Sequence, residues 1–523
     1  MAQGDKVDAV IVGGGAAGIL LAAKLGHGGK KVVVLEQGPA WQLSDLISSQ
    51  IWSRRLKWGT PPVQLDGKNP IAHNFNTGSG FGGAALHHYA NWPRLHPEDF
   101  RMKTQYGRGL DWPISYAELR PYYDRIQTEV GVSGDAKAEV WRPPGAPYPL
   151  PPLRTFRQAE VMAKGFAAIG QRTAPMPQAI LSRPYKGRPA CIYDGWCDAG
   201  CPIGALANPL VTYLPVAQKA GADFRAQSYV TRVLMSDKGD RALGVEYYDA
   251  QKQRQEQHAD VVILASNAVQ NPRLLLNSAT DTHPDGIANS SGLVGRYFMV
   301  HFGGRVLGLF DEDLENHMGT TGNQLMCQES YAKDKHGGPF GSYTWQITQA
   351  FKPNDITGLV NARGNLFGDD LHAFIRQAAK GLAAIQALGE QLPDPDNRVT
   401  LGDKKDEYGL PLARVTHAND DNMLALWRYA LDEGMRAMKG AGAKEAWTAP
   451  SPGLIHVMGG TVMGKSAKDS VCDSYGRTHD VHNLVLAGTG LNPTEGGVHP
   501  TFTMHALALR TSEHMLGNWR GYA

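Results

Sequence analysis

Three cysteines lie close together in the chain, in the pattern Cys191-x5-Cys197-x3-Cys201-Pro. Thiolates at such spacing can converge on one metal centre, and iron–sulfur sites commonly end in Cys-Pro. A structural zinc site normally has a fourth Cys or His ligand. None is obvious nearby, since Asp194 and Asp198 are weaker candidates. The pattern therefore favours a cuboidal cluster with three irons over unligated or disulfide-bonded cysteines in a loop.

A glycine motif near the N-terminus has the residue types needed to bind a dinucleotide. Gly13, Gly15 and Gly18 form G-x-G-x-x-G. The first glycine makes a tight turn, the second lets the backbone approach a pyrophosphate, and the third lets helix and strand pack closely. Glu36 can accept hydrogen bonds from a ribose hydroxyl. These residues predict a dinucleotide site but do not distinguish NAD from FAD.

The hydrophobic pattern predicts the elements that position this motif. Residues 7–12 read as a buried parallel strand, residues 16–25 as a helix whose N-terminus attracts phosphates, and residues 31–35 as the next strand. This is a β-α-β unit. Four further strands are expected to return to the same domain, at residues 226–234, 242–248, 261–265 and 483–486.

A second glycine-rich loop, GFGGAALHH, occupies residues 80–88. Gly82 and Gly83 allow a close approach of the backbone to another part of the cofactor. The alternative interpretation is a tight turn followed by a short helix.

Composition and length exclude several classes of function. The 523 residues suffice for two or three domains, and 52 Lys and Arg balance 50 Asp and Glu. Such a balance gives no global field that would recruit nucleic acid or a membrane surface. No stretch approaches the roughly 20 uninterrupted apolar residues of a membrane span, and no targeting signal is evident. Taken alone, these features predict a soluble cytoplasmic enzyme.

Two regions differ in character from the dinucleotide unit. Residues 95–209 are rich in Pro, Trp and Tyr, which predicts loops and extended segments. Residues 305–448 combine helix and strand patterns, as expected of a domain that caps an active site. The expected elements are a strand in GSYTWQITQAF, helices at 371–388 and 422–438, and two strands around a polar turn within 398–417. A last helix is expected within 499–515.

Several segments, in order along nearly the whole chain, resemble the glucose–methanol–choline (GMC) flavin oxidoreductases. They are GGGAAG with Glu36, GFGGAALHH, SNAVQNPRLLLNS, and IHVMGGTVMG followed by AGTGLNPTEGGVHPTFTMHALAL. The middle of the chain, with SRPYKGRPAC, the cysteine cluster and HPDGIANSSGLVGR, resembles the large subunits of bacterial FAD-dependent sugar dehydrogenases. The resemblance implies FAD as the dinucleotide.

The fold expected from motifs and resemblance is α/β, with a discontinuous Rossmann-like FAD-binding domain and an inserted α+β substrate-binding domain. Residues 1–94, 210–304 and 451–523 are assigned to the FAD-binding domain. Residues 95–209 form an insertion that carries the cysteines, and residues 305–450 form the substrate-binding cap.

Two histidines are candidates for the chemistry of alcohol oxidation. This reaction needs a base that takes the hydroxyl proton while hydride leaves the carbon for flavin N5, and imidazole suits that role near neutral pH. The resemblance places the catalytic histidine at His456, and a second histidine or an asparagine at His499. We expect His456 to be the base, and His499 to hold the substrate oxygen and share the proton. His479, His482 and His505 are expected to be ordinary surface or core residues.

The resemblance assigns further contacts to FAD. Val230, Gly488 and Asn492 are expected to touch the cofactor. In several family members a histidine at the place of His87 is covalently bonded to the flavin, whereas other members bind flavin without this bond. Both possibilities stay open, and His88 stands where many relatives have asparagine.

The resemblance also implies that Cys191, Cys197 and Cys201 carry a [3Fe–4S] cluster, whereas Cys327 and Cys472 only pack. Flavin takes two electrons as hydride and a cluster passes them singly, which predicts a dehydrogenase. In the resembling complexes the acceptor is a multihaem cytochrome c, and a small partner subunit bears the export signal. We therefore expect a periplasmic location with such a partner, and a cytoplasmic one without it.

The implied substrate is a hydroxyl of a sugar, glycoside or polyol, with the oxidised carbon undetermined. Trp345 and Gln346 are candidates to line the pocket, although a sheet core explains them equally well. One alternative is a GMC oxidase that uses O2 and has structural cysteines. Another is a non-catalytic flavin-binding or electron-transfer subunit.

Overall fold

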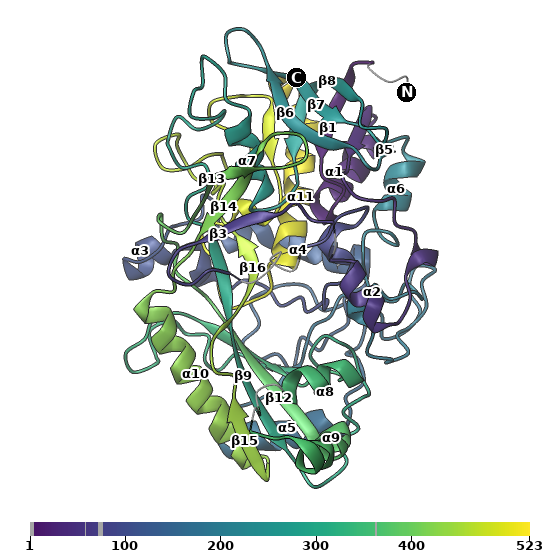
Figure 1. The fold of residues 1–523 in the computed structure, drawn as a ribbon, viewed down its shortest axis with the longest axis vertical. Coiled ribbons are helices and arrows are strands. Elements are labelled where there is room, and N and C mark those ends of the chain that lie inside the picture. Colours follow the sequence, from purple (N-terminus) through teal and green to yellow (C-terminus); the bar gives the residue numbers. More distant parts are fainter. Residues whose placement is uncertain (1–4, 58, 72–76, 361–362, 364) are drawn as a thin grey trace.

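Two large sheets, stacked end to end along the molecule, organise the fold (Figure 1). The computed structural model describes residues 5–57, 59–71, 77–360, 363 and 365–523. The first sheet lies in the upper half of Figure 1 and the second in the lower half, with strand β16 between them. The mixed α/β class expected from the sequence is confirmed.

The first sheet has seven strands in the order β5-β2-β1-β8-β7-β6, with β17 paired to β8. Its strands β1, β2, β5, β8 and β17 pair in parallel. The buried Val, Ile and Leu runs of β1, β2, β8 and β17 are typical of strands covered on both faces. The bounds are β1 Val7–Val12, β2 Val32–Leu35, β5 Asp223–Arg225, β6 Tyr229–Met235, β7 Ala242–Tyr248, β8 Arg254–Leu264 and β17 Leu484–Leu486.

Helices from distant parts of the sequence cover this sheet. Helix α1 packs against α6 and α11, and α11 packs in turn against α4. Helix α11, near the C-terminus, thus lies in the same half of the molecule as strand β1, near the N-terminus (Figure 1). The bounds are α1 Ala16–His27, α4 Tyr116–Val130, α6 Leu214–Lys219, α7 Gln270–Asn277, α11 Pro500–Gly517 and α12 Trp519–Tyr522.

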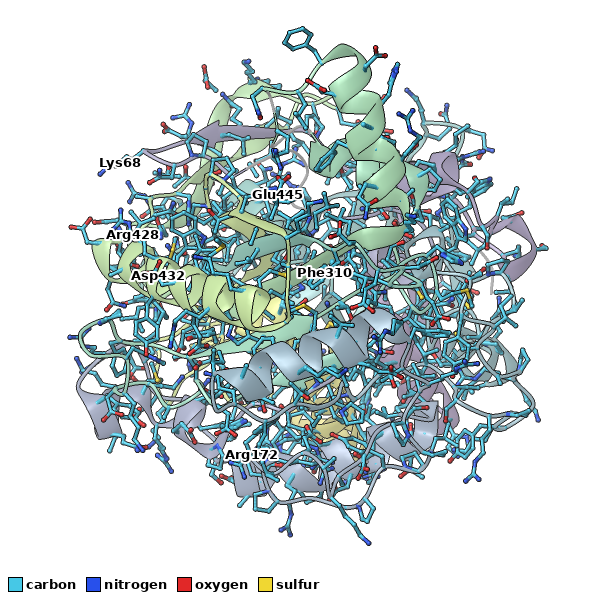
Figure 2. All side chains as sticks on the ribbon, turned by 90° about the horizontal axis from the view of Figure 1, so that it is seen from below. Lys68, Arg172, Phe310, Arg428, Asp432 and Glu445 are labelled. Carbon is cyan, nitrogen blue, oxygen red and sulfur yellow. The ribbon has the colours of Figure 1, made fainter. Side chains whose placement is uncertain are left out.

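The second sheet has the order β15-β9-β12-β11-β10-β4, with β16 also paired to β9, and the name cap is used for this sheet. Helices α10 and α5 pack together over it, and Figure 2 shows Arg428 and Asp432 on the outer side of α10. The bounds are β4 Ala174–Pro175, β9 Met299–Leu309, β10 Leu325–Cys327, β11 Tyr343–Ile347, β12 Leu382–Gly389, β15 Glu445–Thr448, β16 Gly453–Met458, α5 Arg157–Ala168, α8 Pro353–Val360, α9 Gly368–Gly381 and α10 Asp421–Gly440.

The helix expected over 371–388 is wrong in its second half. Helix α9 ends at Gly381, and residues 382–389 form β12, the strand between β9 and β11. A Cβ on Gly381 would lie 2.2 Å from the Phe310 carbonyl oxygen, so the chain passes close to β9 there. The mostly apolar strand β12 lies between two neighbouring strands, and nearly all of its residues are buried whichever face they point to. Its sequence therefore lacks the alternation of a half-exposed strand and cannot be distinguished from a buried helix by periodicity.

The region 95–209 contains more regular structure than its composition predicts. Helices α4 and α5 were expected to be loops, yet α4 has 15 residues. Ser115 and Glu118 form a capping box at its start, and Pro121 is tolerated within it. Smaller elements complete the fold: α2 Gln50–Arg55, α3 Met102–Tyr106, and a three-stranded sheet of β3 Val63–Asp66, β13 Arg398–Lys405 and β14 Pro411–Thr416.

Within the described part of the chain, no helix combines the length and apolar character that crossing a membrane requires.

Candidate active site

A large cavity lies between the two sheets, and both glycine loops reach it. Its walls include Gly13 and Gly15 from the first loop and Gly83 from the second. At one end it is bounded by Glu36, and at the other by His456 and residues of the second sheet. The cavity therefore connects the predicted dinucleotide site with the predicted catalytic histidines.

The two glycine loops are joined directly. The Gly82 amide donates to the Gly14 carbonyl at 2.8 Å, and a Cβ on Gly83 would lie 3.1 Å from the Gly15 Cα. A Cβ on Gly18 would meet the Gly13 carbonyl oxygen at 2.1 Å, which explains the need for glycine where α1 packs on the turn. By contrast, a Cβ on Gly15 would meet nothing within 4 Å, because this residue faces the cavity.

Glu36 holds three backbone segments together at the end of β2. Its Oε2 accepts from the Gly14 amide at 2.8 Å, and its Oε1 accepts from the Gly38 amide at 2.8 Å and the Gly80 amide at 2.9 Å. The carboxyl is buried, and burial raises its pKa even though the three amides act to lower it. Glu36 also borders the cavity. Its expected hydrogen bond to a ribose hydroxyl stays a prediction.

The other expected cofactor residues differ in their relation to the cavity. Val230, Gly488 and His87 line it, and burial lowers the pKa of His87 to about 3. Asn492 is buried behind the wall, with Nδ2 3.7 Å from the Met458 sulfur. A covalent bond from His87 to flavin stays a prediction.

The geometry fits FAD. Helix α1 begins at Ala16, and its N-cap residue Gly15 has no side chain to bond the first amides. Because the first turn also contains no acidic residue, these amides are available to phosphate. Gly13 and Gly15 would hold the pyrophosphate, and Gly83 with Val230 would border the rest of the cofactor.

His456 and His499 meet at the far end of the cavity, with ring centroids 5.2 Å apart. His456 is the extra residue of a β-bulge, since Ile455 and Val457 pair with the adjacent residues His301 and Val300. Its φ of 60° is uncommon for a non-glycine residue, and bulges of this kind redirect side chains near active sites. His499 immediately precedes α11, which begins at Pro500.

Both histidines are neutral near pH 7. Burial lowers the pKa of each imidazole well below 6.5, and a neighbouring histidine lowers it further. A neutral imidazole has the free lone pair that a base needs. The pair can therefore accept a proton from a hydroxyl group that is bound in the cavity beside the two rings.

Two residues beside this pair were missed by the sequence analysis. Asn91 Nδ2 lies 3.4 Å from His499 Nε2, and the Asn91 side chain also contacts Asn323. His301 Nδ1 lies 3.2 Å from His456 Nδ1. Both come from segments without a histidine motif, so only tertiary structure identifies them.

The cap supplies a polar row that faces the cavity. Gln346, Gln386 and Arg305 pair in register across β11, β12 and β9, and all three line the cavity. Arg305 donates to Gln386 Oε1 at 3.0 Å, whereas Gln346 Nε2 is buried with no hydrogen-bond partner within the described residues. Trp345 instead packs in the hydrophobic core between the second sheet and helices α5 and α10, and its indole N–H donates to Glu433.

The remaining histidines near the C-terminus have structural contacts. His479 bonds Ser470, His482 bonds Arg241, and His505 bonds the Thr501 carbonyl. These contacts agree with the expectation that the three are ordinary residues.

The three clustered cysteines are free thiols, each with a backbone amide directed at its sulfur. The amides of Tyr193 and Thr321 lie 3.3 Å and 3.4 Å from the sulfurs of Cys191 and Cys197. The Cys201 sulfur accepts from Leu206 at 3.4 Å.

These thiols do not form a metal site in this arrangement. Burial raises the pKa of all three thiols, that of Cys191 to about 12. Across the described ranges, no group of three His, Cys, Asp or Glu side chains is placed to hold a metal ion. The geometry therefore gives the expected [3Fe–4S] cluster no support. Cys327 and Cys472 are also free and buried.

We expect acid to destabilise the fold through its buried histidines. Burial lowers the pKa to about 3 for His87, His88 and His301 and to about 4 for His505. Below pH 6.5 the unfolded chain binds protons that the folded chain does not, so stability is lost as pH falls, by up to about 1.4 kcal/mol per pH unit for each histidine.

Thermal unfolding between pH 8 and pH 5 checks this effect. The melting temperature should be level above the unfolded-state histidine pKa and fall below it. The melting temperature of the His505→Gln variant, which lacks one of these histidines, should fall less steeply with decreasing pH. A melting temperature that rises on acidification through this window would contradict the assignment.

Comparison with known proteins agrees with this site. Two GMC oxidoreductase family models match residues 7–303 and 393–508. The chain is 32% identical to 2-methyl-1,2-propanediol dehydrogenase of Mycolicibacterium austroafricanum, covering 98% of this chain and 95% of the relative. It is also 32% identical to the fructose dehydrogenase large subunit of Gluconobacter japonicus, covering 98% of both.

Among solved structures, pyridoxine 4-oxidase from Mesorbium loti has the same fold, with a TM-score of 0.68 and 17% identity over 97% of this chain and 98% of that one. Family matches, relatives and fold lead to one conclusion: the chain belongs to the GMC oxidoreductases, FAD-dependent enzymes that oxidise CH–OH groups.

Proposed function

We propose that this enzyme is a dehydrogenase that oxidises a hydroxyl of a sugar, glycoside or polyol. The observation that carries the proposal is the neutral His456 and His499 pair at the cap end of the cavity. Bound FAD supplies the hydride acceptor for this oxidation. His456 takes the hydroxyl proton, and His499, with Asn91 beside its Nε2, orients the substrate oxygen.

The polar row of the cap supports a substrate with several oxygen atoms. Arg305 and the Gln346 amide, which has no hydrogen-bond partner in the described part of the chain, present donors to the cavity from this sheet. Gly303 makes room for this row, since a Cβ there would lie 3.1 Å from Gln386 Nε2. Donors fixed in a buried wall select hydroxyl-rich ligands, because an apolar ligand would leave them unpaired.

Replacing Arg305 by methionine should weaken substrate binding more than it slows chemistry. Loss of a hydrogen bond from a charged donor is worth about 1.5–3 kcal/mol, so KM for a sugar or polyol should rise about 10-fold or more. Steady-state kinetics with an artificial dye acceptor measure this. Arg428→Met, on the exposed face of α10, is the matched control (Figure 2). An unchanged KM for every productive substrate would remove Arg305 from the binding site.

We propose further that the cysteine loop binds the [3Fe–4S] cluster expected from the sequence. The spacing Cys191-x5-Cys197-x3-Cys201-Pro is the basis of this proposal, and the amides now directed at the three sulfurs would donate hydrogen bonds to a bound cluster. Binding of the cluster would have to draw the three sulfurs together from their present positions.

The proposed physiological acceptor is a multihaem cytochrome c, and the proposed location is the periplasm, reached with a signal-bearing small subunit. The name of the fructose dehydrogenase large subunit agrees with such a partner.

Iron analysis separates this proposal from an oxidase. Anaerobically purified protein should contain about three irons per chain and give a low-temperature EPR signal that changes when substrate is added. A Cys197→Ser variant should lose the iron but keep the flavin. Iron-free protein that reduces O2 to peroxide at the full rate of substrate oxidation would instead establish the alternative, a GMC oxidase with structural cysteines.

A further inference from the structure

The catalytic histidine is in contact with a second, fully buried histidine from the neighbouring strand. His301 lies on β9 opposite Ile455 of β16, immediately before the bulge that carries His456. The two Nδ1 atoms lie 3.2 Å apart, and the rings are nearly perpendicular, at 89°. His301 is not part of the cavity wall, so it reaches a substrate only through His456.

The proton positions in this contact follow from the partner on the other side of His301. Its Nε2 lies 2.6 Å from the Gly496 carbonyl oxygen, which can only accept, so Nε2 carries the proton. Burial lowers the pKa of His301 to about 3, so the ring is neutral and its Nδ1 has a lone pair. The hydrogen bond between the two Nδ1 atoms then needs the proton on His456.

We propose that His301 is a positioning residue that holds His456 in the tautomer with its proton on Nδ1 and its lone pair on Nε2. This inference rests on the proposed function, since it names the atom of His456 that takes the hydroxyl proton. This relay is a chain of two hydrogen bonds, from His301 to the Gly496 carbonyl and from His456 to His301. No proton moves along it before substrate binds. It presents Nε2 as the base before substrate binds.

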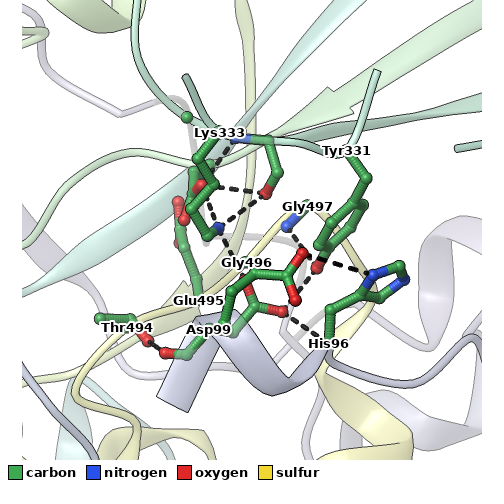
Figure 3. A network of polar contacts seen from close by, with 12 residues as sticks. His96, Asp99, Tyr331, Lys333, Thr494, Glu495, Gly496 and Gly497 are labelled. Carbon is green, nitrogen blue, oxygen red and sulfur yellow. Dashed lines mark hydrogen bonds and ion pairs between the residues drawn. The ribbon is translucent and has the colours of Figure 1, made fainter. Parts of the chain in front are cut away.

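The Gly496 carbonyl is itself fixed by a buried ionic network (Figure 3). The next residue along the chain, Gly497, donates its amide to the Tyr331 hydroxyl at 3.2 Å, and that hydroxyl donates to Asp99 Oδ2 at 2.7 Å. Asp99 Oδ1 pairs with Lys333 at 2.6 Å, and all of these side chains are buried. The Gly496 carbonyl and the Gly497 amide belong to one peptide group, so the carbonyl cannot turn away from His301 without breaking the buried bond from Gly497 to Tyr331.

The same loop continues to His499. Because Gly496 and His499 are three residues apart, one rigid segment sets both the tautomer of the base and the position of the second histidine. Glu495 reinforces the segment by accepting from the Gln391 amide.

Two variants of His301 isolate its acceptor atom. His301→Leu removes both ring nitrogens, whereas His301→Asn also loses the Gly496 contact but can place its amide oxygen where Nδ1 was. The two therefore share any damage to packing and differ in the bond to His456. Circular dichroism and flavin content of the holoenzyme should match between them.

The direct readout is nitrogen NMR of the holoenzyme with labelled histidine, in which the His456 resonance is the one lost in His456→Ala. Wild type and His301→Asn should show protonated Nδ1 and unprotonated Nε2, and His301→Leu a mixture of tautomers. His301→Leu should lower kcat by about 10- to 100-fold with a much smaller change in KM, and His301→Asn should restore most of it.

A wild-type His456 signal with protonated Nε2 would overturn the inference. So would equal kcat losses in the leucine and asparagine variants, which would mark a packing role, or no loss in either. The NMR readout needs no turnover, so the relay would still be detected if the protein oxidised no sugar or polyol. That outcome would overturn the proposed function alone.

Discussion

Replacing His456 by alanine should lower kcat for alcohol oxidation by about 10²- to 10⁴-fold, the usual contribution of a general base. The reason is that the neutral imidazole at the bulge is the group placed to take the substrate proton, and alanine leaves the hydroxyl protonated as hydride departs. Steady-state dye reduction and single-turnover flavin reduction under anaerobic conditions measure the loss. FAD content should be unchanged, since Gly13, Gly15 and Glu36 hold the opposite end of the cavity.

His372→Ala is the matched control for this variant. His372 lies on the exposed side of α9, away from the cavity. It should keep the wild-type rate. A His456→Ala enzyme with full substrate-dependent dye reduction would contradict the assignment of the base and would revive the view of the protein as a non-catalytic subunit.

Replacing Glu36 by glutamine should release FAD and destabilise the fold. The carboxylate accepts three backbone amides that come from three separate segments. Glutamine replaces one accepting oxygen by an NH2 group that faces amide donors. Each buried donor left without an acceptor costs about 1–3 kcal/mol, which is a large fraction of the stability of a protein.

Flavin content and thermal unfolding of the purified protein measure both effects. Glu36→Gln should contain little FAD, and its apoprotein should melt at a lower temperature than wild-type apoprotein. Glu256→Gln, an exposed position on β8, should match wild type in both. Normal flavin content together with a normal melting temperature would mean that the three amide contacts are dispensable.

The sequence predicted the parts of the site whose chemistry is local. The glycines at 13, 15 and 18 need particular backbone geometry within one turn, and that need is visible as residue type at fixed spacing. His456 and His499 were identified through motifs that resemble a known family. The same resemblance supplied FAD, which the glycine motif alone left undecided.

The rest depends on contacts between distant segments, which residue types do not encode. His301 is a single histidine in an apolar strand, and only its pairing with β16 gives it a partner. The positive φ of His456 and the in-register row of Arg305, Gln386 and Gln346 are likewise products of strand pairing. The strand at 382–389 was mistaken for helix because burial on both sides removes the alternation that marks a strand.

The cysteines show the opposite case, in which spacing predicted more than the fold provides. Their pattern and position in the chain favour a cluster, yet the described geometry shows three free thiols, each with its own amide partner.

The central claim is that this chain uses His456 to oxidise a sugar or polyol hydroxyl with bound FAD as the acceptor. Its most direct test mixes anaerobic holoenzyme with a panel of sugars, glycosides and polyols and follows the flavin absorbance in a single turnover. We expect rapid bleaching of the flavin by at least one polyhydroxylated substrate in the wild type and strongly slowed bleaching by the same substrate in His456→Ala. Flavin that stays oxidised with every member of the panel, or bleaching at equal rates in both proteins, would contradict it.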